Sequence, residues 1–363
     1  MSKPLRLLII APRFGSINRG VEIFVRELIR RLDKKRFHVT ILSGPHDQLL
    51  EDVEMVKMPL FSRERLAVWA KPFSSIFPKR WFLGPVELEA LSLMFHSRDF
   101  FQKNVFDAIL PFGGTWTYRF ANKYRHGAHI ISIGHGGPVL SDLLLSDLFV
   151  ALTPTDEALA RTICPGINTV VIPNGVDAAC FKKAEKLPGQ GAGKVKKILC
   201  AAALTEDKRH DLLFDAALRM DDSIHILCAG DGPMKPFLLQ HPLYHKGRVE
   251  FVTKFHSDMP SLYQDADVFT LASPSEAFGL VFLEALASGL PVVAHDGPRQ
   301  KYVVGDAGFF CNVYDPLSYL HALDQALNAV DNSIGVSHAK KFSWDSIALK
   351  YQELITDLCE NNS

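Results

Sequence analysis

The chain has 363 residues, of which 47% are hydrophobic, so it is long enough to form two well-packed domains. Its 40 basic and 40 acidic residues balance, but residues 1–175 hold 22 Lys and Arg against 16 Asp and Glu, whereas residues 176–363 hold 18 against 24. No nucleic-acid partner is expected from this balance, while the basic first half favours an anionic partner such as a phosphate-bearing substrate or a lipid surface.

No stretch approaches 18 consecutive apolar residues, which argues against a membrane-spanning helix. The apolar run at residues 7–11 is too short for the core of a signal peptide and is predicted to be a first buried strand. The six cysteines form no CxxC pair, and two of them lie in strand-like apolar runs. Reduced, buried thiols of this kind indicate a cytoplasmic protein.

Short apolar runs alternate with helical patterns along the first half. Residues 21–32 place six apolar side chains on one helical stripe, which predicts an amphipathic helix. The predicted strands of this half cover residues 5–11, 38–43, 107–112, 129–134, 147–152 and 169–173. Strands that are apolar throughout and alternate with helices indicate a parallel sheet covered on both faces.

The stretch from about residue 60 to residue 105 breaks this alternation. It mixes nine Phe and Trp residues with seven Lys and Arg residues. Such a mixture favours an amphipathic surface that lies against a membrane or an acceptor. The alternative is an aromatic-rich insertion that packs on its own domain.

The second half repeats the strand and helix pattern, with a predicted helix at residues 211–220 and a last amphipathic helix at residues 343–358. Its predicted strands cover residues 196–204, 223–230, 249–253, 267–273 and 290–295. The fold class is therefore predicted to be α/β, with two doubly wound, Rossmann-like domains at residues 1–174 and 175–342. Residues 343–363 are expected to form a helix that packs back toward the first domain.

Two glutamates, Glu276 and Glu284, stand out in the run SPSEAFGLVFLEALASGLPVV at residues 273–293. Glu276 lies in a polar turn after a predicted strand, and Glu284 lies among apolar residues of the following helix, where a carboxylate needs a partner. Residues beyond the carboxyl ends of parallel strands form the ligand sites of such sheets. The amides of Phe278, Gly279 and Leu280 would bind a diphosphate or a sugar hydroxyl at the start of this helix. The two carboxylates would accept hydrogen bonds from sugar hydroxyls or from a vicinal diol.

This run resembles the signature of the family-four retaining glycosyltransferases of the GT-B fold, in which Glu-x7-Glu precedes a small-residue helix and G-x-P-V-V. Further pieces of the chain are similar to segments of that family in the same order: RGVEIFVRELIRRL (19–32), IPNGVDAACF (172–181), ILCAGDGP (226–233) and VVGDAGFF (303–310). The resemblance implies two Rossmann-like domains that face each other across a cleft. The first would bind the acceptor and the second the nucleotide-sugar donor.

The resemblance also implies roles for individual residues. Glu276, His135 and Lys208 would act on the transferred sugar and the diphosphate. The donor would also be bound by Glu284, at its ribose, and by Phe278, Gly279, Leu280, Arg209, Gly20 and Gly15. The chain departs from the family at Ala203, where many members have an arginine, and Arg209 is the expected replacement for that charge. The nucleobase pocket is expected near Lys254 and Phe255.

Three other patterns are weighed and set aside. Asp265-Ala266-Asp267 spells a DxD metal motif, but the second Asp begins a predicted strand instead of lying in a loop. HGGP at residues 135–138 is similar to a lipase oxyanion motif, but the chain has no G-x-S-x-G. GSINRG at residues 15–20 does not fit the dinucleotide fingerprint G-x-G-x-x-G.

The expected function is that of a retaining, metal-independent glycosyltransferase in polysaccharide or glycolipid assembly. It would move a hexose from a UDP- or GDP-sugar to a sugar or lipid-linked acceptor, in the cytoplasm or at the inner face of an anionic membrane. No cofactor and no metal are expected. The alternatives are a nucleotide-sugar 2-epimerase of the same architecture and a degenerate, non-catalytic subunit, for which Ala203 is the only indication.

Overall fold

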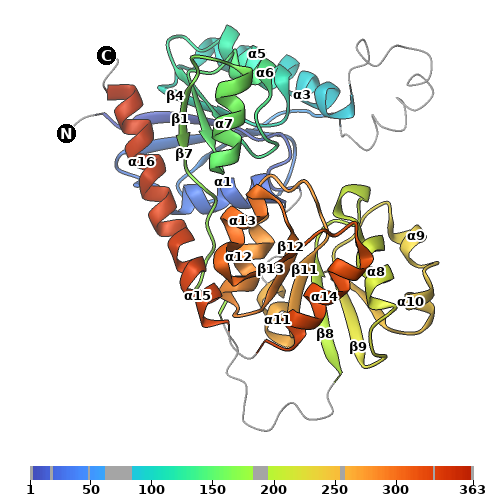
Figure 1. The fold of residues 1–363 in the computed structure, drawn as a ribbon. Coiled ribbons are helices and arrows are strands. Elements are labelled where there is room, and N and C mark those ends of the chain that lie inside the picture. Colours follow the sequence, from blue (N-terminus) through green and yellow to red (C-terminus); the bar gives the residue numbers. More distant parts are fainter. Residues whose placement is uncertain are drawn as a thin grey trace. The chain divides into compact units, whose positions relative to one another are not determined.

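The computed structural model describes residues 3–16, 19–47, 50–61, 84–182, 195–253, 258–329 and 332–360. The chain divides into two compact units. Unit 1 comprises residues 1–173 and 345–363, and unit 2 comprises residues 174–344. Each unit is an α/β domain built on one parallel sheet (Figure 1).

Unit 1 contains a seven-stranded sheet in the order β3-β2-β1-β4-β5-β6-β7. Its strands are β1 (Leu5–Ile10), β2 (Phe37–Ser43), β3 (Glu54–Lys57), β4 (Ala108–Pro111), β5 (His129–Ile133), β6 (Leu148–Ala151) and β7 (Asn168–Val171). All pairs in this sheet are parallel. The central strands β4 and β6 are buried along their whole length, as their apolar sequences predict.

The helices of unit 1 are α1 (Gly20–Arg31), α3 (Pro85–His96), α4 (Arg98–Lys103), α5 (Thr115–Lys123), α6 (Leu140–Leu143), α7 (Pro154–Ile163) and most of α16 (Trp344–Glu360). Helix α16 returns to unit 1 from the far end of the chain and contacts α1 (Figure 1). Arg31 donates a hydrogen bond to Asp345, and the rings of Phe24 and Tyr351 meet edge to face at 5.3 Å. The last helix is therefore part of the core of unit 1.

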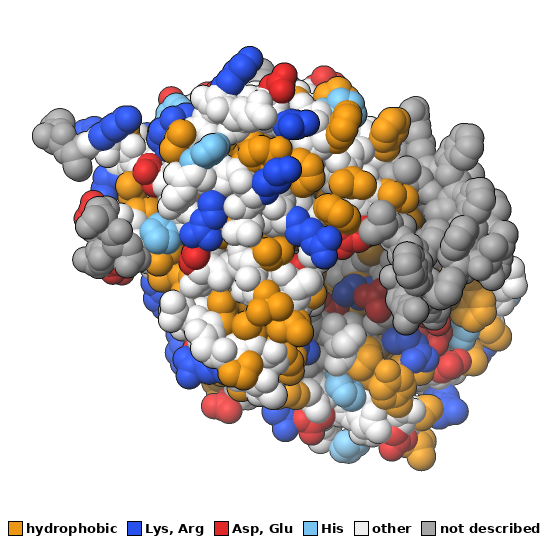
Figure 2. All heavy atoms as spheres, turned by 90° about the horizontal axis from the view of Figure 1, so that it is seen from above, with side chains coloured by type: hydrophobic (Ala, Val, Ile, Leu, Met, Phe, Trp, Pro, Cys, Tyr) orange, Lys and Arg blue, Asp and Glu red, His pale blue; other side chains and the backbone are white. Residues whose placement is uncertain are grey.

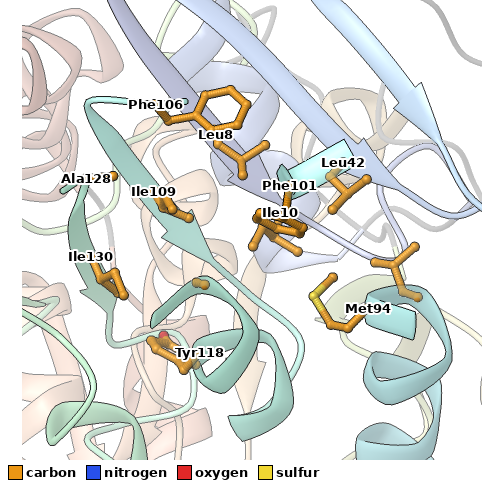
Figure 3. Close-up of a cluster of buried hydrophobic side chains, with 12 residues drawn as sticks. Leu8, Ile10, Leu42, Met94, Phe101, Phe106, Ile109, Tyr118, Ala128 and Ile130 are labelled. Carbon is orange, nitrogen blue, oxygen red and sulfur yellow. The ribbon is translucent and has the colours of Figure 1, made fainter. Parts of the chain in front are cut away.

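One hydrophobic cluster fills the space between the sheet of unit 1 and its helices. Figure 3 shows Leu8 and Ile10 of β1 among side chains of neighbouring strands, with Met94 of α3 and Tyr118 of α5 beside them. These side chains are almost completely buried. Their removal from water favours folding of this half, together with a second buried cluster that contains Leu143, Phe149, Ala151 and Ala160.

The surface of unit 1 exposes several large hydrophobic side chains. Phe95 on α3 is 74% exposed and Leu144, just after α6, is 68% exposed. Figure 2 shows a face of the molecule on which hydrophobic and basic side chains are interspersed. The expected amphipathic surface from residue 60 to residue 105 lies partly outside the described residues, because Trp69, Phe73, Phe77, Trp81, Phe82 and their basic neighbours are not described.

Unit 2 contains a six-stranded parallel sheet in the order β10-β9-β8-β11-β12-β13. Its strands are β8 (Lys196–Ala201), β9 (Ile224–Ala229), β10 (Val249–Val252), β11 (Val268–Leu271), β12 (Val292–His295) and β13 (Gly308–Cys311). Its helices are α8 (His210–Ala217), α9 (Lys235–Leu238), α10 (Pro242–His245), α11 (Met259–Asp265), α12 (Leu280–Ala287), α13 (Pro298–Val304), α14 (Pro316–Leu327) and α15 (Ser333–Ala339).

The prediction of two doubly wound parallel-sheet domains is confirmed. In each sheet the strand order reverses beside the first strand of the domain, between β1 and β4 in unit 1 and between β8 and β11 in unit 2. Loops at such a switch point leave the sheet in opposite directions and open a crevice at the carboxyl ends of the strands. These two crevices are the places where the fold favours ligand binding.

Candidate active site

The switch point of unit 2 brings together two of the predicted site residues, Lys208 and Glu276. Lys208 ends a short 3-10 helix in the loop after β8, and Glu276 lies in the turn between β11 and α12. The Lys208 ammonium donates a hydrogen bond of 2.5 Å to Glu276 Oε1, although the two residues are 68 positions apart. The side chains are only 22% and 12% exposed, so this ion pair is largely shielded from water.

Burial and charge act in opposite directions on Lys208. Burial lowers the pKa of its ammonium, but the negative charges of Glu276 and Asp207 outweigh burial, so the pKa lies above its usual value. Lys208 is therefore a permanent cation at physiological pH. Its charge is available to any anion that competes with Glu276.

Gly279 supplies the start of helix α12 beside this pair. Gly279 has φ of +83° and φ/ψ values in the left-handed region, where glycine meets no steric penalty. A Cβ at this position would also lie 2.5 Å from the Phe282 ring. No side chain caps α12, so its first amides have no partner within the helix. The expected amide-lined position around Phe278, Gly279 and Leu280 is thus a helix N-terminus suited to an anion.

Glu284 lies about one turn after the start of α12 and is 7% exposed. The hydroxyl of Tyr263, on α11, donates a 2.7 Å hydrogen bond to Glu284 Oε2. Burial raises the pKa of Glu284 to about 7, and the Tyr263 hydrogen bond only partly offsets that effect. The carboxyl group therefore changes its charge near neutral pH.

Arg209, the expected replacement for the charge missing at Ala203, is already engaged in the structure. Its guanidinium donates hydrogen bonds to both carboxylate oxygens of Asp211 and lies 5.4 Å from the centre of the Tyr314 ring. Its backbone is left-handed, with φ of +48°, which is uncommon for a residue with a side chain. Asp211 pairs with this cation, just as Glu276 and Asp207 pair with Lys208, so both positive charges have carboxylate partners in the structure.

Unit 1 has a pocket of about 260 Å³ at its own switch point. Loops after three strands and the first turn of α1 line it: Ala11, Pro12, Arg13, Arg19, Gly20, Val21, Glu22, Phe112, Gly113 and His135. Glu22 is nearly buried and accepts a hydrogen bond from the Arg19 amide. Burial raises the pKa of Glu22, while this bond opposes the shift.

His135 reaches this pocket from the loop after β5. Its ring packs edge to face on Phe24, with centroids 4.8 Å apart, and against Phe112 at 5.7 Å. Its Nε2 atom is shielded from solvent and finds no hydrogen-bond partner among the described residues. Burial lowers the pKa of His135 to about 3, so the imidazole is neutral across the physiological range.

The two predicted glycines of unit 1 have different surroundings. Gly20 lines the pocket and opens α1, whereas Gly15 is absent from the pocket lining. Gly15 has φ of +82°, and a Cβ there would lie 2.4 Å from the His46 ring. Gly15 therefore shapes the loop after β1 through its backbone conformation.

The acidic residues of the DxD pattern have structural partners. Asp265 pairs with the Lys197 ammonium, and Asp267 accepts a hydrogen bond from the Lys197 amide. Within the described ranges, no group of three or more His, Cys, Asp and Glu side chains is arranged to hold a metal ion. Lys254 and Phe255, the expected nucleobase pocket, lie outside the described residues.

Sequence reasoning missed the partners of these residues. Tyr263, Asp211 and Glu22 carry hydrogen bonds at the two crevices, but none belongs to a distinctive local pattern. Tyr263 is an apolar-stripe residue of α11 that happens to face Glu284. A buried carboxylate predicts that some donor exists, yet it does not tell which residue provides it.

Residues 195–329 match the family model described as glycosyl transferases group 1. The predicted resemblance is confirmed for this part of the chain, which includes Lys208, Glu276 and Glu284. Among curated relatives, the chain is 37% identical over 108 residues to the D-inositol 3-phosphate glycosyltransferase of Corynebacterium urealyticum. The matched residues make up 28% of this chain and 26% of that protein. The chain is also 31% identical over 174 residues to the alpha-monoglucosyldiacylglycerol synthase of Streptococcus pneumoniae. That match covers 44% of this chain and 40% of that protein. The matches thus span less than half of the length of these two relatives.

Solved structures match the fold over nearly the whole chain. The sucrose-phosphate synthase of Thermosynechococcus elongatus superposes with a TM-score of 0.78 at 17% identity, covering 98% of this chain and 99% of that chain. The Anabaena protein HepE in complex with UDP-glucose superposes with a TM-score of 0.72 at 16% identity, covering 97% and 100%. The two parallel-sheet domains therefore have the GT-B fold.

No helix in the described part of the chain is both long enough and apolar enough to cross a membrane.

Proposed function

We propose that this protein is a retaining, metal-independent glycosyltransferase that moves a hexose from a UDP- or GDP-sugar to a glycan or lipid-linked acceptor. The observation that carries the proposal is the shielded Lys208–Glu276 pair beside the uncapped start of α12, at the switch point of unit 2. It combines a cation, free amides and a carboxylate, which are the groups needed for a diphosphate linked to a sugar.

Donor binding would exchange the partners of this pair. The diphosphate, with its higher charge, takes the Lys208 ammonium and the amides at Gly279, and Glu276 is then released to accept hydrogen bonds from sugar hydroxyls. Glu284 binds the ribose diol through its carboxylate. The helix N-terminus and Lys208 together offset the anionic charge, which is the work that a divalent metal does in other glycosyltransferases.

During the reaction, charge develops on both the sugar and the diphosphate of the donor. As the bond between sugar and diphosphate breaks, negative charge grows on the leaving oxygens, and Lys208 and the α12 amides stabilise it. Loss of one such donor typically costs about 3 kcal/mol of barrier. The acceptor hydroxyl then attacks the anomeric carbon from the face that the diphosphate leaves and passes its proton to the departing diphosphate oxygen, which retains the anomeric configuration.

Two observations support a lipid-linked acceptor and peripheral membrane contact at the cytoplasmic face. Phe95 and Leu144 are exposed on unit 1, and Figure 2 shows a face of the molecule on which hydrophobic and basic side chains are interspersed, a composition that suits an anionic bilayer. A relative that matches 44% of the chain is named for a glycolipid product. Flotation with anionic and neutral liposomes tests this part: the protein is expected to float with anionic vesicles at low salt, and its failure to do so would contradict membrane contact.

A thermal-shift and turnover screen with UDP-, GDP-, ADP- and dTDP-sugars in the presence of EDTA tests the function. One nucleotide class is expected to raise the melting temperature and to release nucleotide slowly in the absence of acceptor. Glu284→Ala is expected to lose the shift, whereas Lys197→Met, which breaks a different ion pair of unit 2, should keep it. Dependence on added metal, or epimerisation of the sugar in place of transfer, would contradict the proposal.

Retention is tested separately once a donor and an acceptor are known. Proton NMR of the first product should show the anomeric configuration of the donor sugar. An inverted product would contradict a retaining mechanism and leave the donor assignment standing.

A further inference from the structure

We infer that Gln300, on α13, is a positioning residue that holds the turn carrying Glu276 in its donor-binding geometry. Gln300 is 2% exposed, and its Nε2 donates hydrogen bonds to the carbonyl oxygens of Ser273, at 3.2 Å, and Pro274, at 3.3 Å. These carbonyls lie three and two residues before Glu276. The role of Gln300 in catalysis rests on the proposed function, whereas its hydrogen bonds to the turn do not depend on that function.

The turn needs such support because it belongs to neither a helix nor a strand. Residues 272–279 connect β11 to α12 without regular secondary structure. Backbone carbonyls that are buried without a partner are costly, so Gln300 both satisfies these two groups and restricts the turn. A restricted turn keeps the Glu276 carboxylate within reach of Lys208.

The chemistry of the site requires an amide at position 300. Both neighbours are carbonyl oxygens, which accept hydrogen bonds and cannot donate them, so the side chain must present two N–H groups. Glutamine has two on one nitrogen. An ionised glutamate of the same size would present only acceptors and would repel both carbonyls.

Gly297 provides the space for this arrangement. A Cβ at Gly297 would lie 2.4 Å from Gln300 Oε1, so the glutamine side chain folds against the backbone at the start of α13. Gly297 has φ of −121°, a conformation open to any residue, so the glycine is needed here for room alone. The loop after β12 is thereby connected to the turn after β11, and both lie at the same edge of the sheet.

The titratable and charged groups on the segments around Gln300 are Glu276 on the turn, His295 and Asp296 at and just after the end of β12, Arg299, Lys301 and Tyr302 on α13, Glu284 on α12, Asp306 just after α13, Cys311 on β13 and His338 on α15. Asp296 and Lys301 form an ion pair with each other. A carboxyl introduced at position 300 would be buried, so its pKa would be raised.

The test compares Gln300→Glu, Gln300→Met and the control Gln352→Glu. Gln352 is a buried glutamine of α16 in unit 1 whose Oε1 accepts a hydrogen bond from the Asp33 amide, a role that a carboxylate also performs. Both Gln300 variants are expected to lower kcat for donor turnover at pH 8 by at least tenfold, with the Kd for the free nucleoside diphosphate within threefold of the wild-type value. The control is expected to keep the wild-type kcat.

The pH profile separates positioning from general damage. Once protonated, the carboxyl introduced by Gln300→Glu regains one donor, so the kcat of this variant relative to wild type is expected to rise severalfold between pH 8 and pH 6. The relative kcat of Gln300→Met should stay flat over the same range. The inference would be overturned if the kcat of both variants relative to wild type stayed constant between pH 8 and pH 6. It would also be overturned if the Kd for the nucleotide rose by the same factor as kcat fell. If Gln300→Glu does not fold, the fall in kcat is compared with the change in nucleotide Kd for Gln300→Met alone.

A second measurement is independent of the proposed activity. The coupling between Lys208 and Glu276 is measured as the non-additivity of the melting-temperature shifts of Lys208→Met, Glu276→Gln and the double variant. In the Gln300→Met background this coupling is expected to fall by at least half. If wild type turns over no nucleotide sugar, the proposed function fails and the coupling still decides the role of Gln300. An unchanged coupling would show that Gln300 does not hold the Glu276 turn.

Discussion

Two carboxylates in unit 2, the partly buried Glu276 and the buried Glu284, differ in how the fold compensates their charge. Glu276 has a full counter-charge in Lys208, whereas Glu284 has only the hydroxyl of Tyr263. Burial therefore raises the pKa of Glu284 to about 7, while the Lys208 ammonium is held in its charged form. This difference gives each residue a separate experimental signature.

Removal of Lys208 is expected to destabilise the protein because it leaves the shielded Glu276 without its counter-charge. Lys208→Met should lower the free energy of unfolding by about 2–3 kcal/mol, below the usual range for fully buried pairs because both side chains keep some exposure. Lys208→Met/Glu276→Gln should recover most of that loss. Denaturant unfolding measures the free energies of unfolding of the single and double variants. As a control, Lys197→Met, which breaks a more exposed pair with Asp265, should lower the free energy of unfolding by less than about 1 kcal/mol.

The raised pKa of Glu284 predicts a specific pH dependence of stability. Between pH 4.5, its ordinary pKa, and pH 7, the folded protein keeps a proton that the unfolded chain has lost. The contribution of Glu284 to the free energy of unfolding therefore falls as pH rises through this window, by an amount on the order of 2–3 kcal/mol. Glu284→Gln should abolish this slope, so the variant should gain stability relative to wild type from pH 5 to pH 8. A gain that does not change with pH would contradict the assignment.

Arg248 shows how a single side chain connects elements of unit 2. It immediately precedes β10 and is almost fully buried, and its guanidinium donates to the carbonyls of Ile224, Met220, Ala217 and Asp221. These carbonyls belong to the end of α8, the first residue of β9 and the loop between them. The planar fork of donors suits several acceptors at once, which lysine cannot match.

Arg248→Met is therefore expected to lower the free energy of unfolding by about 3 kcal/mol, since four carbonyls, three of them in buried hydrogen bonds, lose a charged donor. Arg248→Lys should cost less, because it keeps the charge and one or two of the bonds. Chemical denaturation with matched variants measures this. Arg161→Met, at an exposed pair with Glu157 on α7, should change stability by less than about 1 kcal/mol.

At the scale of the whole molecule, each unit has its own core, and the last helix belongs to unit 1. Tyr351 of α16 is fully buried against Phe24 of α1. Its hydroxyl finds no hydrogen-bond partner among the described residues. The aromatic ring, and not the hydroxyl, is therefore what contributes to stability.

Calorimetry is expected to resolve the two units as separate thermal transitions. Tyr351→Ala should lower the transition of unit 1, at a cost of about 3–5 kcal/mol, whereas Tyr351→Phe should be neutral or slightly stabilising. Arg248→Met should lower the transition temperature of unit 2, and a bound nucleotide should raise the transition temperature of unit 2. A single transition that all variants shift equally would contradict independent cores.

Much of the fold could be predicted from local patterns. Runs such as residues 108–112 and 148–152 are apolar throughout, which favours burial on both faces and hence a parallel sheet with helices on each side. The apolar neighbours of Glu284 predict its burial in α12, and the glycine at 279 predicts an unusual backbone at the start of that helix. These predictions depend on residues close in sequence, where periodicity and backbone sterics act directly.

The contacts of the candidate site could not be predicted in the same way. Lys208 meets Glu276 across 68 positions, Tyr263 faces Glu284 from another helix, and Gln300 reaches the turn after β11 from α13. None of these pairs leaves a local pattern, because loop paths and helix packing decide which side chains meet. The roles predicted for the site residues stay predictions until the donor is identified.

By itself, the sequence determined the alternation of buried strands and amphipathic helices, the doubly wound class of both domains and the position of the two glutamates beyond a strand end. These follow from hydrophobic burial and backbone geometry over a few residues. Only the tertiary structure decided that Lys208 pairs with Glu276, that His135 is a neutral ring between two phenylalanines, and that Gln300 supports the Glu276 turn. Charge state and orientation depend on the groups that folding brings within a few ångströms, and those groups come from distant parts of the chain.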